Sequence, residues 1–322
     1  MRKQMLLSFL AGLILPLSLT ALFQQSPPVG DVERGSLSPS QVREEWDGKV
    51  TLTVKNKGGN LQQMALDEYL TGVVLGEMPA DFEPEALKAQ AVVARTYTRK
   101  RMEGGKHGEA AVCMDPACCQ SWRSPEDYLA EGGRQSAVDK VRRAVAETDG
   151  LVLRYEGKLI DATYFSCSGG STEDAVAVWG QDVPYLQAVE SPGEEDAPRF
   201  TDTVKFSSGE FAEKLGMTVS GDPVDWFGAV TYTDGGGVDT MTIRGQTFTG
   251  TQLRSKLGLR STAFEISVSG NTVTITTRGF GHRVGMSQYG AQAMAREGST
   301  CAEILAHYYT GTELVREENG TD

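Results

Sequence analysis

Residues 67–79 constrain the fold most, because they place a single carboxylate at the end of an apolar helical stripe. Side chains at i, i+3, i+4 and i+7 share one face of an α-helix, and a mostly apolar face turns inward. Here the four positions are Leu70, Val73, Val74 and Glu77. The pattern predicts a helix that packs on a core and carries Glu77 at its inner edge.

The residues at the two ends of this segment set the expected limits of the helix. Asp67 has a side chain suited to the N-cap position, and Pro79 disfavours the helical conformation of the residue before it. The helix should therefore end just after Glu77. Burial there removes hydration, raises the pKa of the carboxyl and suits it to general-acid chemistry near neutral pH. The alternative is a surface glutamate at a frayed helix end.

Charge limits the partners of this chain. The 322 residues carry a formal net charge of −12, whereas a protein that binds DNA or RNA usually presents a basic face. A polysaccharide remains compatible with this charge, because it is bound mainly through hydrogen bonds and stacking.

The N-terminus predicts export. Residues 5–23 contain no charge and follow Arg2 and Lys3, so they are long enough to form a transmembrane helix with the basic residues in the cytoplasm. A cleaved signal peptide is the alternative, but no clear small-x-small site lies near Ala21. Residues 24–45 read as a flexible tether, and the rest of the chain should lie outside the cytoplasm.

Hydrophobic periodicity predicts an α+β, strand-rich domain over residues 46–316, with helices that carry the motifs. We expect two lobes around a substrate cleft, with a smaller lobe at 195–265 and a disordered tail at 317–322. Expected helices cover 84–101, 136–148, 287–296 and 301–308, and expected hairpins join 151–154 to 158–164 and 264–268 to 272–277.

One histidine and three cysteines crowd into thirteen residues after the second helix, and they are His107, Cys113, Cys118 and Cys119. This donor set suits tetrahedral Zn²⁺. Four protein ligands would make the site structural, whereas three would leave a position for water and chemistry on a substrate. The alternative is a loop of free or oxidised thiols.

Two further groups of residues suit a sugar ligand. Cations on the second helix could bind the carboxylate of a sugar acid; the alternative is a solvated helix face, which is favoured for Lys88 taken alone. The glycine-rich segment 279–294 opens a helix with free N–H groups, and the polar turn 164–170 follows a strand and could line the same cleft. The candidate substrate-binding residues are Lys88, Arg95, Tyr164, Ser166, Ser168, His282, Ser287, Gln288 and Tyr289.

Several long motifs resemble one known family. They are Gly76-Glu-Met-Pro79, the segment 85–97, Ser166-Cys-Ser-Gly-Gly170, Val178-Trp-Gly180 and the segment 279–291. Together they resemble the stage II sporulation protein D family, which is related to amidase-enhancer proteins. Members are membrane-anchored lytic transglycosylases that cut peptidoglycan strands already stripped of stem peptides. They act with a sporulation amidase and a membrane partner during engulfment, which implies a place in the mother-cell engulfing membrane.

The resemblance also implies roles for individual residues. Glu77 matches the family's catalytic glutamate, and Lys88 and Arg95 match basic positions of the motif helix. His107, Cys113 and Cys119 fit a zinc-binding pattern of some members, with Cys118 as a fourth ligand. We expect a structural zinc ion.

Two residues depart from the family pattern. Arg283 stands where glycine is usual, and Cys167 stands where serine or threonine is more common. Both departures lie within the sugar-binding motifs, so they bear on the geometry of the site.

The expected reaction is non-hydrolytic cleavage between N-acetylmuramic acid and N-acetylglucosamine, which gives 1,6-anhydro ends. One carboxylate suffices because the nucleophile belongs to the substrate, whereas a hydrolase normally needs a second. Asp161, Asp115 and Glu109 are the nearest candidates for that partner, and no motif supports them. The competing interpretation is a non-enzymatic, wall-binding activator of a peptidoglycan amidase.

Overall fold

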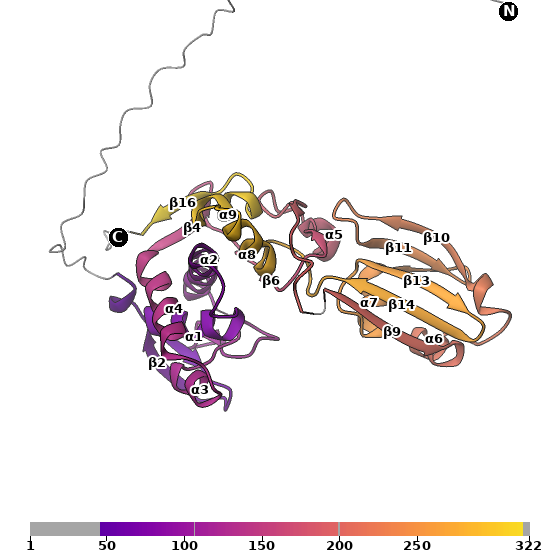
Figure 1. Ribbon diagram of the computed structural model, residues 1–322, viewed down its shortest axis with the longest axis horizontal. Helices are drawn as coiled ribbons and strands as arrows, with labels where there is room; N and C mark the ends of the chain where they lie inside the picture. Colours follow the sequence, from indigo (N-terminus) through magenta and orange to yellow (C-terminus); the bar gives the residue numbers. More distant parts are fainter. Residues whose placement is uncertain (1–45, 106, 199, 318–322) are drawn as a thin grey trace, which may run out of the picture. The chain divides into compact units, whose positions relative to one another are not determined.

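The computed structural model describes residues 46–105, 107–198 and 200–317, and within these ranges the chain is α+β, as predicted (Figure 1). The helices are α1 Leu66–Glu77, α2 Pro84–Glu103, α3 Pro125–Ala130, α4 Gln135–Glu147, α5 Ala175–Trp179, α6 Ser208–Leu215, α7 Gly250–Leu257, α8 Gln288–Arg296 and α9 Cys301–Tyr308. The strands are β1 Thr51–Lys55, β2 Leu61–Ala65, β3 Val112–Cys113, β4 Leu151–Tyr155, β5 Lys158–Leu159, β6 Tyr164–Phe165, β7 Gly170–Ser171, β8 Glu190–Ser191, β9 Thr201–Ser207, β10 Phe227–Tyr232, β11 Val238–Ile243, β12 Gln246–Thr249, β13 Phe264–Ser269, β14 Thr272–Arg278, β15 Met286–Ser287 and β16 Glu313–Arg316.

The predicted anchor (1–23) and tether (24–45) lie outside the described residues. Within the described ranges, no helix combines the length and the apolar character that crossing a bilayer requires. At the other end, Glu317 was expected in the disordered tail but is held by ion pairs to Arg99 at 2.7 Å and Arg154 at 3.2 Å.

Helix α1 ends at Glu77, as predicted, but it begins earlier than expected. Its N-cap is Ala65, and no side chain caps it. Asp67 lies in the first turn instead, where its carboxylate accepts a hydrogen bond from the Glu68 N–H at 2.8 Å. Strand β2 ends at Ala65, and α1 begins at the next residue. The Leu66 N–H donates to the Val50 carbonyl at 2.8 Å. This long-range pairing, rather than a cap, fixes the start of α1.

Helix α2 lies at the centre of the larger core. It contacts α1, α4, α8, α9 and β4, and Figure 1 shows these elements around it. The close packing follows from small side chains, because the stripe of Leu87, Ala91, Ala94 and Thr98 is fully buried.

The sheets that belong to this core are small. Their strand orders are β2-β1-β3 and β16-β4-β5. A two-stranded parallel pair joins β15 to β6, with Met286 opposite Tyr164 and Ser287 opposite Phe165. This pairing brings the start of α8 beside the polar turn 164–170, although more than a hundred residues separate them in the chain.

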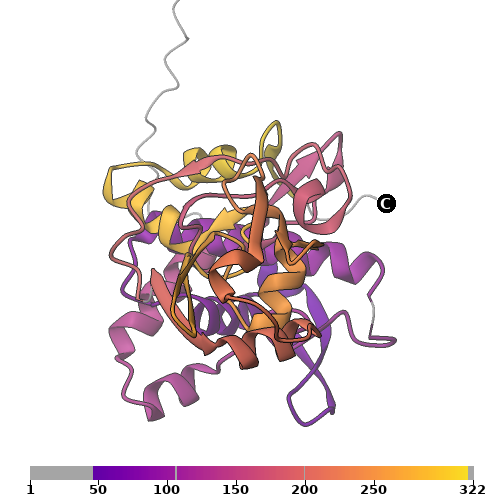
Figure 2. The same ribbon diagram turned by 90° about the vertical axis from the view of Figure 1, so that its right-hand side faces the viewer.

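A second hydrophobic core gathers apolar side chains from residues 204–275, coloured brown and orange in Figures 1 and 2. It comprises the sheets β13-β14-β9 and β10-β11-β12, with α6 and α7 packed against them. Phe211, Trp226, Leu253, Val273 and Ile275 are buried in it.

Candidate active site

Glu77, the last residue of α1, is half-buried against the loop that precedes α3. Two glycines of the helix make room for this loop. A Cβ at Gly72 would lie 2.1 Å from the indole nitrogen of Trp122, and one at Gly76 would lie 3.0 Å from the Ser121 carbonyl. Because the loop packs directly on the helix, the Ser121 N–H donates to Oε1 of Glu77 at 2.5 Å.

The surroundings of Glu77 favour its protonated form. Burial removes water from the carboxylate and raises its pKa. Hydrogen bonds from the Ser121 N–H and from the side chains of Tyr164 and Gln288 stabilise the charged form and offset part of that shift. The carboxyl can therefore hold a proton, and three donors are placed to stabilise it after the proton leaves.

Glu77 lies in a cleft with a volume of ≈ 520 Å³ that joins motifs distant in the chain. The predicted site residues that line this cleft are Glu77, Tyr164, Ser166, His282, Gln288, Cys118 and Cys119. The sequence motifs before α2, after β6 and before α8 thus meet at one place, next to the cysteine-rich loop.

His282 forms one wall of the cleft. Its Nδ1 accepts a hydrogen bond from the Val284 N–H at 3.1 Å, so the neutral ring carries its proton on Nε2. Its ring centroid lies 5.4 Å from that of Trp179 and 5.6 Å from that of Phe165. Burial lowers the pKa of His282 to about 4, and the imidazole is therefore uncharged at neutral pH.

Lys88 and Arg95 do not reach the cleft, contrary to the prediction from the sequence. Arg95 is fully buried, and its guanidinium pairs with the Asp47 carboxylate at 2.6 Å. Lys88 pairs with Glu85 at 2.8 Å and with Glu147 at 2.6 Å. Both cations link elements of the larger core, so neither is placed to hold a sugar acid.

Three other predicted contacts also lie away from the cleft lining. Ser168 is fully buried and donates to the Glu194 carboxylate at 2.9 Å. Ser287 is buried as the N-cap of α8. Tyr289 packs edge-on against Phe82, with 5.1 Å between the ring centroids. None of these three residues is among those that line the cleft.

Sequence reasoning missed Glu194, a buried carboxylate that organises the polar turn. It accepts hydrogen bonds from the Cys167 thiol at 2.9 Å, the Ser168 N–H at 2.5 Å and the Ser191 hydroxyl. Burial, followed by the nearby Glu194 charge, raises the pKa of Cys167, so this residue serves as a thiol donor. The network fixes the segment that presents Ser166 to the cleft. Nothing in the acidic stretch 190–203 distinguishes Glu194 from its neighbours.

The structure explains Arg283, the other departure from the family pattern. Its backbone has φ +67°, a conformation that glycine adopts without strain. Its side chain is buried and pairs with Glu173 at 2.9 Å. It also donates to the carbonyls of Ser171 at 2.8 Å and Gly235 at 2.6 Å. The guanidinium therefore points away from the cleft and ties the β10–β11 turn to the segment beside His282.

Glu77 also lines a second hollow, with a volume of ≈ 490 Å³. The charged residues of this hollow, besides Glu77, are Asp81, Arg123 and Arg134. Glu77 is the one residue that this hollow shares with the cleft.

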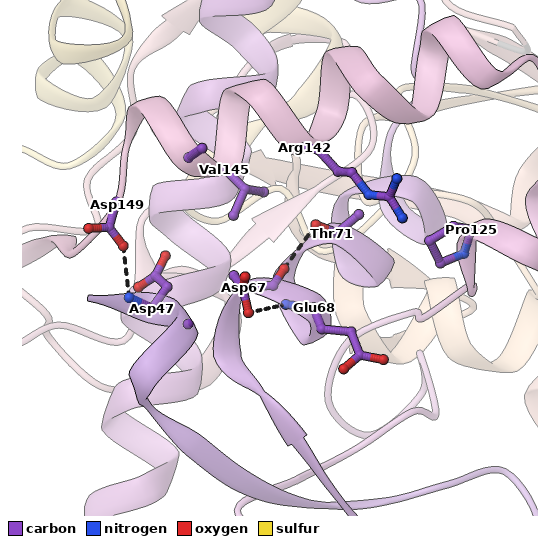
Figure 3. Close-up of a pocket in the computed structure, with 10 residues that line it drawn as sticks. Asp47, Asp67, Glu68, Thr71, Pro125, Arg142, Val145 and Asp149 are labelled. Atoms are coloured by element: carbon purple, nitrogen blue, oxygen red, sulfur yellow. Dashed lines mark hydrogen bonds between the residues drawn. The ribbon is translucent and has the colours of Figure 1, made fainter. Parts of the chain in front are cut away.

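A third hollow of ≈ 310 Å³ lies between the start of α1 and the end of α4 (Figure 3). Asp47, Asp67, Glu68, Arg142 and Asp149 line it. The Asp149 carboxylate accepts hydrogen bonds from backbone N–H groups, among them that of Asp47 at 2.8 Å. This hollow contains neither Glu77 nor any predicted site residue, so it is distinct from the candidate active site.

The cysteine-rich loop forms a cluster that could hold a metal ion. Donor atoms of His107, Cys113, Cys118 and Cys119 all lie within 4.8 Å of one another. Nε2 of His107 lies 3.2 Å from the Cys119 sulphur and 3.5 Å from that of Cys118. The predicted donor set is thus brought together at one edge of the cleft that contains Glu77.

Comparison with known proteins identifies similar sequences. The sequence model of the family described as stage II sporulation protein matches residues 55–155, which include Glu77 and the cysteine cluster. An amidase enhancer of Bacillus subtilis (strain 168) is 29% identical over 304 residues, which cover 76% of this chain and 40% of that protein.

Two relatives match nearly the whole length of the chain. The stage II sporulation protein D of Bacillus subtilis (strain 168) is 38% identical over 324 residues, which cover 96% of this chain and 94% of that protein. Its counterpart in Bacillus amyloliquefaciens is 39% identical over 296 residues, 88% of this chain and 86% of that protein. The chain therefore belongs to the stage II sporulation protein D family.

Proposed function

We propose that this protein is a lytic transglycosylase of peptidoglycan. Its substrate would be a glycan strand stripped of stem peptides, cut between N-acetylmuramic acid and N-acetylglucosamine. The observation that carries the proposal is Glu77, whose pKa is raised in a cleft with no other carboxylate among its lining residues. Such a group suits general-acid catalysis at near-neutral pH.

Glu77 serves twice in the proposed reaction. The protonated carboxyl donates its proton to the glycosidic oxygen while the bond from that oxygen to the muramyl C1 breaks. Ser121, Tyr164 and Gln288 then stabilise the carboxylate through their hydrogen bonds. The carboxylate next accepts the proton of the muramyl C6 hydroxyl, whose oxygen bonds to C1 and closes the 1,6-anhydro ring. No water is consumed, and Glu77 regains its proton.

The three carboxylates that the sequence offered as partners of Glu77 give no support for hydrolysis. A hydrolase normally needs a second carboxylate about 5–5.5 Å or 6.5–9.5 Å from the first. Asp161, Asp115 and Glu109 do not line the cleft, and Asp161 pairs with Lys100 at 2.6 Å. The muramyl C6 hydroxyl can replace water as the nucleophile, so a single carboxylate meets the need.

We infer that the cysteine cluster holds one Zn²⁺. Imidazole nitrogen and thiolate sulphur are its usual donors, and the spacing of the four donor atoms suits a single ion. When bound, the ion supplies a structural cross-link, because four protein ligands leave no open position. Cys118 and Cys119 lead directly into Ser121, so this link would steady the N–H that contacts Glu77.

We also propose that the protein is anchored by residues 1–23 with its catalytic domain outside the cytoplasm, in the mother-cell engulfing membrane. There it would act in septal wall degradation with a sporulation amidase and a membrane partner. The likeness to an amidase enhancer supports a link to a wall amidase.

That likeness also favours a second function, a non-enzymatic activator that binds the wall. An activator would need the cleft for binding but would not need an acid at Glu77. The products formed from peptide-free glycan strands therefore separate the two functions.

The test is digestion of peptide-free glycan strands by the wild type and by Glu77→Gln, with products identified by mass spectrometry. We expect 1,6-anhydro ends from the wild type and a rate at least about 10²- to 10⁴-fold lower in the variant, the usual contribution of a general acid. Reducing ends would indicate a hydrolase, and no products would indicate an activator. Undiminished cleavage by Glu77→Gln would refute the role of Glu77.

A further inference from the structure

The two hollows that meet at Glu77 differ in charge. The cleft that contains Tyr164 and Gln288 has no lysine or arginine among its lining residues, and His282 is uncharged there. The other hollow is lined by two arginines, Arg123 and Arg134. A strand that crosses Glu77 would therefore pass from a neutral region into a cationic one.

Both guanidinium groups are available to a ligand. Arg134 begins α4 as its N-cap residue, is exposed, and has no ion-pair partner among the described residues. Arg123 pairs with the exposed Glu131 at 3.4 Å, with 41% of its own side chain accessible. An exposed pair of this kind is weak, so a ligand can replace Glu131. The carboxylates that face the hollow are Glu77, whose pKa is raised, and Asp81.

The proposed substrate offers one matching group. Of its two alternating sugars, N-acetylglucosamine is neutral, whereas a peptide-free N-acetylmuramic acid carries a lactyl carboxylate. Arginine binds carboxylates through charge-assisted and often bidentate hydrogen bonds. In a chain with a net charge of −12, a local pair of arginines beside the reactive acid is electrostatically complementary to an anionic ligand.

We propose that Arg123 and Arg134 bind the lactyl carboxylate of the muramyl residue that is being cut. This inference rests on the proposed function and adds the direction of the strand: the muramyl residue lies in the arginine hollow, and N-acetylglucosamine lies on the side of Tyr164 and Gln288. Glu77 lies at the boundary, where the scissile oxygen must be. A stem peptide converts the lactyl carboxylate into a neutral amide, so the same contact selects stripped strands.

The test measures binding and needs no turnover. The probe is a peptide-free glycan oligosaccharide, compared with the same oligosaccharide after its lactyl carboxylates are converted to methylamides. In the Glu77→Gln background, we expect the acid form to bind about 3- to 20-fold more tightly than the amide, the range for two exposed ion pairs. Adding Arg123→Gln and Arg134→Gln should abolish that preference.

Arg142 provides a matched control, because it lies on the same helix as Arg134 but lines the separate hollow shown in Figure 3. Arg142→Gln in the Glu77→Gln background should keep the full preference for the acid form. High salt should reduce the preference for the acid form in the Glu77→Gln protein that keeps both arginines, since exposed ion pairs are screened. Circular dichroism should show the same fold in every variant.

The outcomes separate this inference from the proposed reaction. Equal binding of acid and amide, no glycan binding at all, or a preference that survives loss of both arginines would overturn it. An acid preference that depends on the arginines, in a protein whose wild type forms no anhydro ends, would support the subsite while refuting the transglycosylase.

Discussion

Burial shifts the pKa values of Glu77 and His282 in opposite directions, and both shifts favour the uncharged form. An uncharged cleft suits a ligand that presents neutral hydroxyl and acetamido groups. It also sets the protonation states of the mechanism. Glu77 works as an acid below its raised pKa, and activity should fall as pH rises through that value. His282 stays neutral until the pH drops to about 4.

The shift of His282 predicts a pH-dependent stability. Its folded pKa of about 4 lies below the ordinary value of 6.5, so folded protein binds the proton less readily than unfolded protein. The resulting stabilisation is present above pH 6.5 and is lost as pH falls towards 4. Between pH 7 and 4.5, this effect should change the free energy of unfolding by an amount on the order of 1–3 kcal/mol, and we expect His282→Gln to remove that change. Urea unfolding at both pH values measures it.

The control for this experiment is His307→Gln, because His307 lies outside the cleft, where its ring bonds to the Glu190 carbonyl. The stability of that variant should vary with pH as the wild type does. A pH dependence that persists unchanged in His282→Gln would contradict the assignment of a buried, neutral imidazole.

At the scale of elements, local patterns predicted what local forces determine. Helix α9 has the predicted limits, and α4 and the β13–β14 hairpin match their predicted limits within about one residue. These elements could be predicted because the spacing of apolar residues within each segment indicates its secondary structure. The start of α1 and the parallel β15–β6 pair were not predictable in this way, since both depend on backbone partners far away in sequence.

The same distinction separates the site residues. Glu77, Tyr164, His282 and Gln288 belong to motifs whose residue types already indicate chemistry. Arg95 was wrongly assigned to the site, because the sequence does not show which carboxylate a cation on a helix face pairs with. Its carboxylate comes from a residue 48 positions earlier, and only the folded chain reveals that pairing.

The ion pair between Glu173 and Arg283 gives an element-scale prediction. It joins the β10–β11 turn to the segment that carries His282, and both side chains are buried. Removing one partner leaves an uncompensated buried charge, so Glu173→Gln should lower the free energy of unfolding by about 3–5 kcal/mol. The double variant with Arg283→Gly should be less destabilised than the sum of the single variants, because the charge is gone and glycine suits φ +67°.

Denaturant unfolding measures these differences, and the exposed pair of Arg278 and Glu265 supplies the comparison. Arg278→Gln should change the free energy of unfolding by no more than about 1 kcal/mol. Strict additivity of the Glu173 and Arg283 variants would show that the two side chains do not act as a pair.

At the scale of the whole molecule, the loop before α3 connects the cysteine cluster to Glu77. The cluster holds Cys118 and Cys119, Ser121 follows them, and its N–H contacts Glu77. Gln120, in the same loop, donates to the hydroxyls of Tyr69 and Thr98 at 3.2 and 3.0 Å. A cross-link in this loop therefore bears on stability and on the geometry of the acid together.

Metal analysis and chelation test this connection. We expect about one zinc ion per chain, and Cys113→Ser should lose it, whereas Cys301→Ala, which removes a buried thiol outside the cluster, should keep it.

Chelation should lower the melting temperature, by about 2 °C or more for each kcal/mol of metal binding lost, because the ion stabilises only the folded state. It should also slow glycan cleavage without changing the products, since the ion holds the loop and takes no part in the proton transfers. A protein that is purified without metal and whose melting temperature is indifferent to chelator would refute the zinc site. Products that change from anhydro to reducing ends on chelation would instead show that the metal environment acts on the reaction itself.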